Sequence, residues 1–330
     1  MSSVEPIKFM NASFLKPGQT LPLVLEPKST AFDLTLWVKA NLDSVEASLL
    51  KYGAILFRNT GVKTQHDFER FIGTLFPEVL QYIERSTPRT KLSDRVYTST
   101  EYPPDRSIAL HNESSYSSTW PGKICFFCLK RADSQGETPI ADVRNVYKQI
   151  DPKIVDRFIE KGWMLIRNYR AEAGLTWQST FQTKDKTVVE EYCRKAQIEC
   201  AWTGDDNLRT RQARKAVVKH PKTGETVWFS HVSFWHPSSL DPEVRKAMME
   251  VFGEEGLPYN TCYGDGTRIE DSVIEEVKRA YEEEKVLFPW RDGDLLLVDN
   301  MLVAHGRSPF KGPRRILVAM AEPHGGDNTW

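Results

Sequence analysis

The chain has 330 residues, of which 40% are hydrophobic and 27% are charged, and its formal net charge is −1. These are the values of an ordinary folded protein, so they exclude long disordered chains and collagen-like chains. The balanced charge gives no overall attraction to nucleic acid or to an anionic membrane, and we expect neither as a partner.

The N-terminal sequence, MSSVEPIKFMNASF, has no basic segment followed by an apolar one, so no secretory signal is predicted. No run of about 18 apolar residues is present, so no helix is expected to span a membrane. We therefore expect a cytoplasmic protein whose five cysteines are reduced. Cys125 and Cys128 form a CxxC pair, but the surrounding KICFFCLK is typical of a buried strand, which we favour over a metal or redox site.

The first half of the chain is predicted to mix helices with short strands. Apolar residues at helical spacing predict one helix over residues 31–52, and GAILFRN (53–59) predicts a strand after it. Residues 64–76 form an amphipathic helix pattern headed by a threonine cap. Further strands are expected near 124–130 and 138–142, and Asp151-Pro152 marks the start of another helix.

The second half is predicted to contain further helices and to end in strands. Strands are expected over 162–170 and 225–234, and helices over 187–198, 241–252 and 272–285. The last helix opens on a capping box formed by Ser272 and Glu275. Two apolar runs, 293–300 and 314–322, predict buried strands. Without repeats or linkers, we expect one domain over residues 1–330 with helical insertions around 145–285. The fold class is then α+β, with the strands in a sandwich or barrel.

The stretch ALHNESSY (109–116) contains the clearest chemical motif, with His111 and Glu113 two positions apart. In an extended segment these two side chains point the same way and can bind one metal ion. A chain of this composition contains about one histidine and acid at this spacing by chance. The pair therefore indicates a metal site only if a third ligand lies close to it. Iron(II) oxygenases use two histidines and one carboxylate on one face of the metal. His305, between two apolar runs, is the candidate third ligand, although it is equally well interpreted as a turn histidine.

An arginine pair begins the last apolar run. The guanidinium of Arg315 can hold a carboxylate through two parallel hydrogen bonds. Arg314 and Arg315 can also be a solvated surface pair.

Six segments resemble the taurine dioxygenase-like (TauD/TfdA) branch of the Fe(II)/2-oxoglutarate-dependent oxygenases. The resemblance is closest to the clavaminate synthase-like group and the syringomycin-pathway aspartyl hydroxylase group. The segments follow the family's order between residues 53 and 320: GAILFRNTGV, LHNESSY, FFCLKRADSQGETPIAD, WQSTFQT, HPKTGETVWF and GDLLLVDNMLVAHGRSPFKGPRRILVAM. The resemblance implies a double-stranded β-helix, which is a jelly-roll or cupin-like core flanked by helices.

The resemblance also implies Fe(II), 2-oxoglutarate and O2 as cofactor and cosubstrates. It implies that His111, Glu113 and His305 bind the iron and form the catalytic centre. Many relatives carry aspartate at the position of Glu113, and halogenases of the wider superfamily carry glycine or alanine there, so Glu113 argues against halogenation.

For the cosubstrate, the resemblance implies that Thr138 and Arg315 bind the distal carboxylate of 2-oxoglutarate, with Gly136 providing the turn. Arg314 and Arg307 are the alternatives to Arg315, and Thr138 also has a plain interpretation as a residue at the start of a strand.

The implied reaction is hydroxylation of an unactivated C–H bond of an amino-acid-like small molecule in secondary metabolism. The substrate is expected to be free or carried on a peptidyl-carrier protein. Ser230 and His231 replace an Asn-Gln pair found in many relatives, so the substrate's identity stays open. Six side chains are predicted to line the substrate pocket, although each can equally be a packing residue on a strand or a surface residue: Asn112, Arg167, Arg170, Trp177, Gln178 and His231.

Three alternatives stay open. An enzyme of the same fold can desaturate, cyclise or epimerise its substrate. A cupin-like barrel can also be a binding protein without a metal. Finally, two histidines and a glutamate also suit zinc in a hydrolase, although no HExxH motif is present. Succinate release that requires both Fe(II) and 2-oxoglutarate would distinguish the oxygenase from the last two.

Overall fold

A seven-stranded sheet forms the larger half of the central sandwich. The computed structural model describes residues 7–80, 84, 89–204 and 206–325. The strand order is β1-β2-β3-β15-β6-β18-β4, and only β2 and β3 pair in parallel. The strands are β1 (Met10–Phe14), β2 (Leu23–Pro27), β3 (Ala54–Phe57), β4 (Tyr97–Thr98), β6 (Thr119–Lys130), β15 (Leu295–Asp299) and β18 (Arg315–Gly325).

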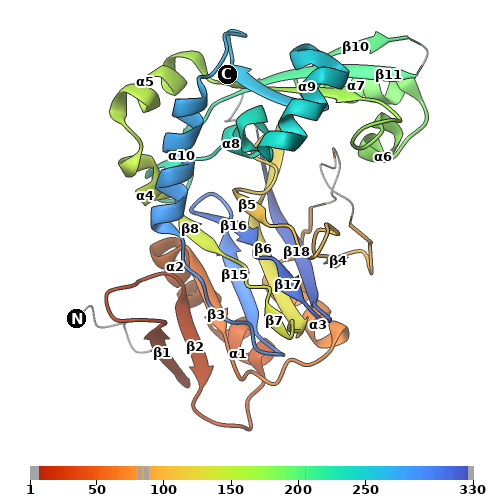
Figure 1. The fold of residues 1–330 in the computed structure, drawn as a ribbon. Helices are drawn as coiled ribbons and strands as arrows, with labels where there is room; N and C mark the ends of the chain where they lie inside the picture. Colours follow the sequence, from red (N-terminus) through yellow and green to blue (C-terminus); the bar gives the residue numbers. More distant parts are fainter. Residues whose placement is uncertain (1–6, 81–83, 85–88, 205, 326–330) are drawn as a thin grey trace.

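Three helices pack on one face of this sheet (Figure 1): α1 (Leu34–Ala40), α2 (Leu42–Tyr52) and α3 (Gln65–Leu75). Their apolar side chains form one buried cluster with the strands, in which Phe68 of α3 stacks on Phe127 of β6. Thr64 and Asp67 form a capping box at the start of α3. The predicted threonine cap is therefore confirmed.

A three-stranded antiparallel sheet lies against the other face, in the order β5-β16-β8. Its strands are β5 (Ile108–His111), β16 (Val303–Arg307) and β8 (Ile140–Asp142), and a short pair, β7 (Ser134–Gln135) with β17 (Phe310–Lys311), follows nearby. The core between the two sheets includes Phe126 and Val318 from the large sheet and Ile140 and Val303 from the small one. Two facing, mainly antiparallel sheets with helices outside correspond to the predicted α+β class.

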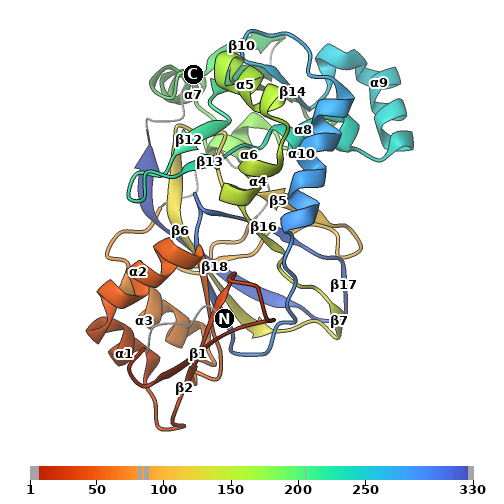
Figure 2. The same ribbon diagram turned by 90° about the vertical axis from the view of Figure 1, so that its left-hand side faces the viewer.

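Most of the chain between β8 and β15 forms a further layer, which lies toward the opposite end of the molecule from α1 and α3 in both views (Figures 1 and 2). It contains a sheet as well as helices, in the strand order β10-β11-β9-β14. Among the described residues, no helix is long and apolar enough to cross a membrane. The elements are α4 (Val143–Gln149), α5 (Pro152–Lys161), β9 (Trp163–Tyr169), α6 (Trp177–Phe181), α7 (Lys186–Lys195), β10 (Glu199–Thr203), β11 (Asn207–Arg214), β12 (Val217–Lys219), β13 (Thr226–Trp228), α8 (Val232–Trp235), the 3-10 helix η1 (Pro237–Ser239), α9 (Pro242–Gly256), β14 (Tyr259–Tyr263) and α10 (Asp271–Glu284).

The single helix predicted over residues 31–52 is wrong, because the chain forms two helices there. Asn41 separates them with a non-helical conformation (φ −134°, ψ 26°), and its Nδ2 donates to the carbonyl oxygen of Trp37. A short polar side chain that bonds its own backbone competes with the helical ladder, which accounts for the break.

Two further predictions about elements are also wrong. The strand expected over 225–234 ends at Trp228, and the Ser230 hydroxyl then accepts from the Val232 amide as the chain turns into α8. The N-cap of α10 is Glu270, so Ser272 lies inside the first turn and forms no capping box. The predicted apolar face of α10 is nevertheless buried: Val273, Ile274, Val277, Ala280 and Tyr281.

The two cysteines of the CxxC pair lie on β6 and face opposite sides of the large sheet. Cys125 packs among the helices, whereas Cys128 packs between the two sheets. Burial raises the pKa of the Cys128 thiol to about 12, which keeps it protonated. The buried-strand interpretation is therefore confirmed.

Candidate metal centre

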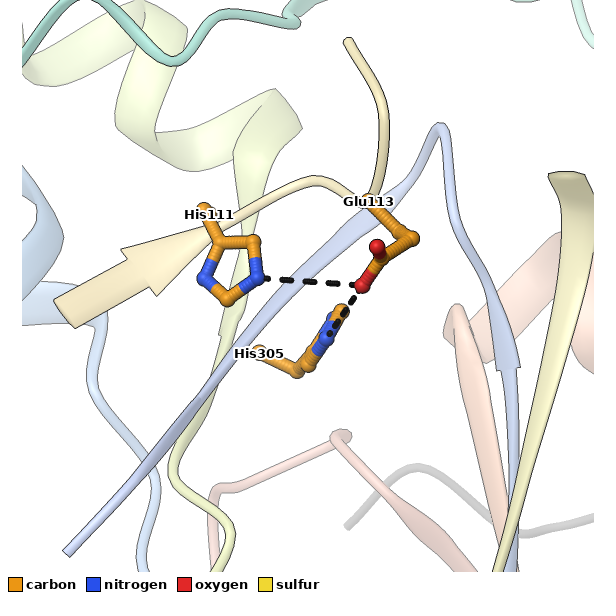
Figure 3. A group of neighbouring side chains, drawn as sticks. All are labelled: His111, Glu113 and His305. Atoms are coloured by element: carbon orange, nitrogen blue, oxygen red, sulfur yellow. Dashed lines mark ion pairs between the residues drawn. The ribbon is translucent and has the colours of Figure 1, made fainter. Parts of the chain in front are cut away.

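Two histidines and a glutamate converge where β5 pairs with β16 (Figure 3). The antiparallel register places His305 directly opposite His111. Glu113 lies in the turn after β5, and its Oε2 is 3.9 Å from Nε2 of His111 and 3.6 Å from Nε2 of His305. The ligand atoms of the three side chains lie within 4.8 Å of one another. Strand pairing thus brings together two segments that are far apart in the sequence.

The charge of Glu113 is paired inside the protein. Its side chain is only 4% exposed, and Arg89 donates to its Oε2 at 2.8 Å. Burial alone raises the pKa of this carboxyl, but the charge of Arg89 and the neighbouring side chains of His111 and His305 hold that pKa well below its ordinary value. Glu113 is therefore ionised at neutral pH, as metal coordination requires.

The two imidazoles are also arranged as metal-binding histidines are. Burial lowers the pKa of His305 to about 4, so its ring is neutral at neutral pH. Nδ1 of His111 lies 2.8 Å from the carbonyl oxygen of Ala109, a contact that requires a proton on Nδ1. Nε2, on the other side of the ring, faces Glu113. Metal-binding histidines are commonly oriented by such a bond.

This donor set fits a divalent transition metal. Among the described residues, these three form the only group of three or more histidine, cysteine or acidic side chains close enough to hold a metal ion. Two imidazoles and one carboxylate are the set that binds non-haem Fe(II) with open positions for other ligands. Zinc accepts the same donors, so the surroundings of the centre must distinguish the two chemistries.

A cavity between the two sheets adjoins the centre. His111 and His305 line it together with an apolar wall formed by Phe126, Ile316 and Val318 of the large sheet. Its remaining lining includes Thr138 and three arginines: Arg89, Arg307 and Arg314. A metal centre therefore shares its cavity with groups that recognise an anion.

Arg314 is the arginine that meets Thr138. Its Nε donates to the carbonyl oxygen of Gly136 at 2.8 Å, and its Nη2 lies 3.5 Å from the Thr138 hydroxyl. The Trp290 indole also donates to that hydroxyl, at 3.1 Å. Burial and the charge of Arg307 lower the pKa of Arg314 to about 10, so it keeps its charge at neutral pH.

The structure does not support the expectation that Arg315 binds the cosubstrate. Arg315 is exposed, and a register shift separates it from Ile316 on β18. Alternate residues of a strand face opposite sides, and Ile316 and Val318 face the cavity, so Arg314 shares their side whereas Arg315 does not. The guanidinium that reaches the cavity is that of Arg314, one residue earlier in the chain.

Of the six side chains predicted to form the substrate pocket, the structure brings His231 to the centre. Its ring centroid is 5.0 Å from that of His111, and the Ser115 hydroxyl lies 2.6 Å from its Nδ1. Burial holds the pKa of His231 well below its ordinary value. Phe234 packs on the same His111 ring, also at 5.0 Å.

Three others are engaged in contacts that account for them structurally. Asn112 is completely buried, and its Nδ2 donates to the carbonyl oxygen of Asn300 at 2.7 Å. Trp177 and Gln178 both donate to Asp206, through the indole and the amide. These contacts stabilise turns, and none of the three side chains lines the cavity described above.

The last two are arginines packed on aromatic rings. The guanidinium of Arg167 is buried 4.6 Å from the ring centroid of Tyr169 and 5.2 Å from that of Tyr259. Arg170 lies over Phe252 at 5.7 Å. Cation–π packing of this kind explains both positions without a ligand.

The sequence pattern does not indicate that two further residues lie near the centre: Arg89 and Asn300. Arg89 reaches Glu113 from 24 residues upstream and belongs to no motif. Asn300 follows an apolar run, where an asparagine is expected simply to begin a turn. Their roles depend on how the strands are connected, which local patterns do not show.

Comparison with known proteins gives consistent matches over most of the chain. The model of the family described as "Taurine catabolism dioxygenase TauD, TfdA family" matches residues 18–320. The dapdiamide synthesis protein DdaC of Enterobacter agglomerans is 40% identical over 279 residues, which cover 84% of this chain and 85% of DdaC. The clavaminate synthase-like protein At3g21360 of Arabidopsis thaliana is 29% identical over 327 residues, covering 92% and 94%.

Among solved structures, the PvcB protein from Pseudomonas aeruginosa superposes with a TM-score of 0.61 at 14% identity, covering 98% of this chain and 95% of PvcB. At this identity the likeness concerns the fold alone. It confirms the double-stranded β-helix flanked by helices that the sequence predicts.

Proposed function

The chain belongs to the taurine catabolism dioxygenase TauD, TfdA family, and from this we propose that it hydroxylates an unactivated C–H bond of an amino-acid-like small molecule in a biosynthetic pathway. As a member, it is an Fe(II)- and 2-oxoglutarate-dependent dioxygenase. DdaC is named for dapdiamide synthesis, and PvcB is described as an Fe, alpha-ketoglutarate dependent oxygenase from an isonitrile synthetic pathway. These names support a biosynthetic role.

The observation that carries the proposal is the meeting of His111, Glu113 and His305 beside a cavity that is lined by the guanidinium of Arg314. These three side chains would hold Fe(II). When bound, the iron and 2-oxoglutarate together activate O2, so that one oxygen atom enters the C–H bond while the cosubstrate leaves as succinate and CO2. The anion-binding lining beside the centre favours this chemistry over that of a zinc hydrolase.

Arg314 and Thr138 would hold the carboxylate of 2-oxoglutarate that lies away from the metal. A dianion in a buried cavity needs a paired charge and hydrogen-bond donors. The Thr138 hydroxyl accepts from Trp290, and its own proton can be donated to a carboxylate. The apolar wall of Phe126, Ile316 and Val318 would keep water away from the carbon chain of the cosubstrate.

We assign the substrate to the other side of His111, against His231 and Phe234. Both rings contact His111, yet neither lines the cavity that holds Arg314. Neutral His231 offers one nitrogen to a substrate while the other faces Ser115. This arrangement suits a small polar molecule with an apolar carbon directed at the metal.

The test is product analysis after incubation with Fe(II), 2-oxoglutarate, O2 and candidate amino acids, both free and attached to a peptidyl-carrier protein. We expect succinate release that requires both Fe(II) and 2-oxoglutarate, with a product heavier by one oxygen atom. A product lighter by two hydrogen atoms would replace hydroxylation by desaturation or cyclisation. Turnover that continues after iron is removed would contradict the proposal.

A further inference from the structure

Asn300 makes an unusually complete set of hydrogen bonds around Glu113. It is fully buried at the turn between β15 and β16. Its Oδ1 accepts from the Glu113 amide at 2.8 Å, and its Nδ2 donates to the Glu113 carbonyl oxygen at 2.9 Å. The second proton of Nδ2 goes to the carbonyl oxygen of Pro121 at 2.8 Å. One side chain thus binds both peptide groups that flank the Cα of Glu113.

The backbone of Asn300 extends the same contact. Its carbonyl oxygen accepts from the Asn112 side chain at 2.7 Å, and its amide donates to the carbonyl oxygen of Gly122 at 2.9 Å. Every polar group of Asn300 therefore has a partner. All of these partners belong to residues 112–122, the segment that carries Glu113 into β6.

The turn that carries Glu113 needs hydrogen-bond partners from another part of the chain. Glu113 lies in a turn beyond the end of β5, where no strand ladder satisfies its buried peptide groups. The next residue, Ser114, has a φ of +56°, in the left-handed region that is unfavourable for a residue other than glycine. Such a turn keeps its conformation only when its surroundings hold it.

The position of Asn300 also links two candidate ligands. Five residues after it, the same connection enters β16 and presents His305. A displacement of this connection would move Glu113 and His305 together, because one end bonds the turn of Glu113 and the other carries the imidazole. The contact therefore fixes the position of one side chain relative to the other.

We propose that Asn300 is a positioning residue of the metal centre, one that holds the Glu113 carboxylate within reach of His111 and His305. The proposal rests on the proposed function, because it assumes that these three side chains bind the metal. Asparagine is required for its two kinds of group: an acceptor toward the Glu113 amide and two donors toward carbonyl oxygens. Aspartate has the same shape but cannot donate, so it would set an oxygen against two carbonyl oxygens.

The test compares Asn300→Asp with Asn168→Asp in Co(II) titrations of the full chain, followed by absorption spectroscopy. Asn168 is a matched control, since its Nδ2 also donates to two carbonyl oxygens, those of Glu255 and Leu257, at 2.9 and 2.7 Å, and it belongs to the insertion layer. We expect Asn300→Asp to weaken Co(II) binding by about 10-fold or more, the range found when groups that orient metal ligands are removed. Asn168→Asp should bind Co(II) like the wild type.

Asn300→Ser keeps the experiment informative if the aspartate variant does not fold, because it removes the two donors without adding charge. It should also weaken Co(II) binding. At saturating metal its KM for 2-oxoglutarate should stay that of the wild type, since Arg314 and Thr138 are unchanged. Wild-type Co(II) affinity in the Asn300 variants, or equal weakening in Asn168→Asp, would overturn the role of Asn300. A wild-type protein that binds no Co(II) would overturn the metal centre itself.

Discussion

At the level of single residues, two arginines that line the cavity, Arg89 and Arg314, differ in what they contact. Arg89 is paired with the carboxylate of Glu113 at 2.8 Å. Arg314 is hydrogen-bonded, among the described residues, to two neutral groups, the Gly136 carbonyl and the Thr138 hydroxyl. A cation that is partly withdrawn from water is stabilised by an anionic partner, and Arg314 lines the cavity beside the centre, so its charge suits an anionic ligand. Arg89 instead keeps Glu113 ionised for the metal.

The adjacent arginines give a direct test of this assignment. Arg314→Ala should raise the KM for 2-oxoglutarate by about 30-fold or more, because truncating one partner of a buried charge pair costs about 2–5 kcal/mol. Arg315→Ala, an exposed change one residue away, should leave that KM within about twofold. Steady-state succinate release at saturating Fe(II) measures both values. A raised KM in the Arg315 variant alone would restore the assignment made from the sequence.

At the level of elements, the centre depends on how closely β5 and β16 approach. Gly306 follows His305, and a Cβ built on it would lie 2.6 Å from the carbonyl oxygen of Ile108 and 3.3 Å from the carbonyl carbon of Ala109. Real side chains do not tolerate the first distance, and both atoms belong to backbone that cannot rotate away. Any other residue at 306 would therefore force the two strands apart.

Gly306→Ala should accordingly separate His305 from His111 and weaken Co(II) binding, by about 10-fold or more if the effect matches that of other groups that orient metal ligands. Gly73→Ala is the control, because Gly73 lies inside α3 with no atom within 4 Å of the added Cβ. Alanine there should be neutral or should stabilise the helix by up to ~1 kcal/mol. Co(II) titration and thermal unfolding of both variants measure the two effects. Unchanged metal affinity in Gly306→Ala would show that the strands adjust without moving the ligands.

The connection between α8 and η1 should make the stability of the fold depend on pH. His236 caps η1, with its Nδ1 accepting from the Ser238 amide at 3.2 Å, so the cap requires an unprotonated ring. Burial lowers the pKa of His236 to about 4, from an ordinary value of 6.5. Between these values the unfolded chain binds a proton that the folded chain excludes. The stabilising contribution is therefore present above pH 6.5 and is lost as the pH falls toward 4.

His236→Asn should keep a capping oxygen but remove this titration. The free energy of unfolding, measured by urea denaturation, should then fall less steeply between pH 6.5 and 4, by ~3 kcal/mol over the whole interval. Every other titratable side chain is the same in both proteins, so the difference between the two curves isolates His236. If the two curves of unfolding free energy against pH are parallel, the pH dependence does not come from His236.

The elements also show what the sequence could and could not predict. Long, strongly apolar or well-capped segments such as α3, β15 and β18 were predictable, because their patterns reflect burial on one face or both. The break at Asn41 was not, since it depends on one side chain bonding the backbone. The choice between Arg314 and Arg315 was not, because both faces of β18 are apolar and buried, so the residue pattern does not show which face lines the cavity.

The same limit applies to the centre. The motif around His111 and Glu113 indicated a metal site, and the structure brings His305 to it. Arg89 and Asn300 could not be predicted, because each contacts Glu113 through tertiary contacts with no fixed spacing in the sequence. Trp177 and Gln178 were chosen for their chemistry, but Asp206 satisfies both.

At the level of the whole molecule, the turn after β15 connects the large sheet, the metal centre and the insertion. Asn300 bonds the turn of Glu113, while the preceding Asp299 makes a separate set of contacts. Asp299 accepts from Lys123 of β6 at 2.7 Å and lies 3.2 Å from His220, which follows β12. Burial alone raises the pKa of Asp299, but the hydrogen bond from His220 and the charge of Lys123 lower it to about 2.

Breaking this buried pair should destabilise the entire fold. Lys123→Met keeps the volume of the side chain but leaves Asp299 as a buried carboxylate without its cation, which costs about 3–5 kcal/mol. Lys130→Met is the matched control on the same strand: Lys130 is about half exposed and lies 3.5 Å from Asp292, an exposed pair whose loss costs less than about 1 kcal/mol. Urea unfolding at neutral pH measures both changes. Adding Asp299→Asn to Lys123→Met should recover part of the loss, because no buried charge then remains at the pair. If the double variant is no more stable than Lys123→Met, the destabilisation comes from lost packing and not from the uncompensated carboxylate.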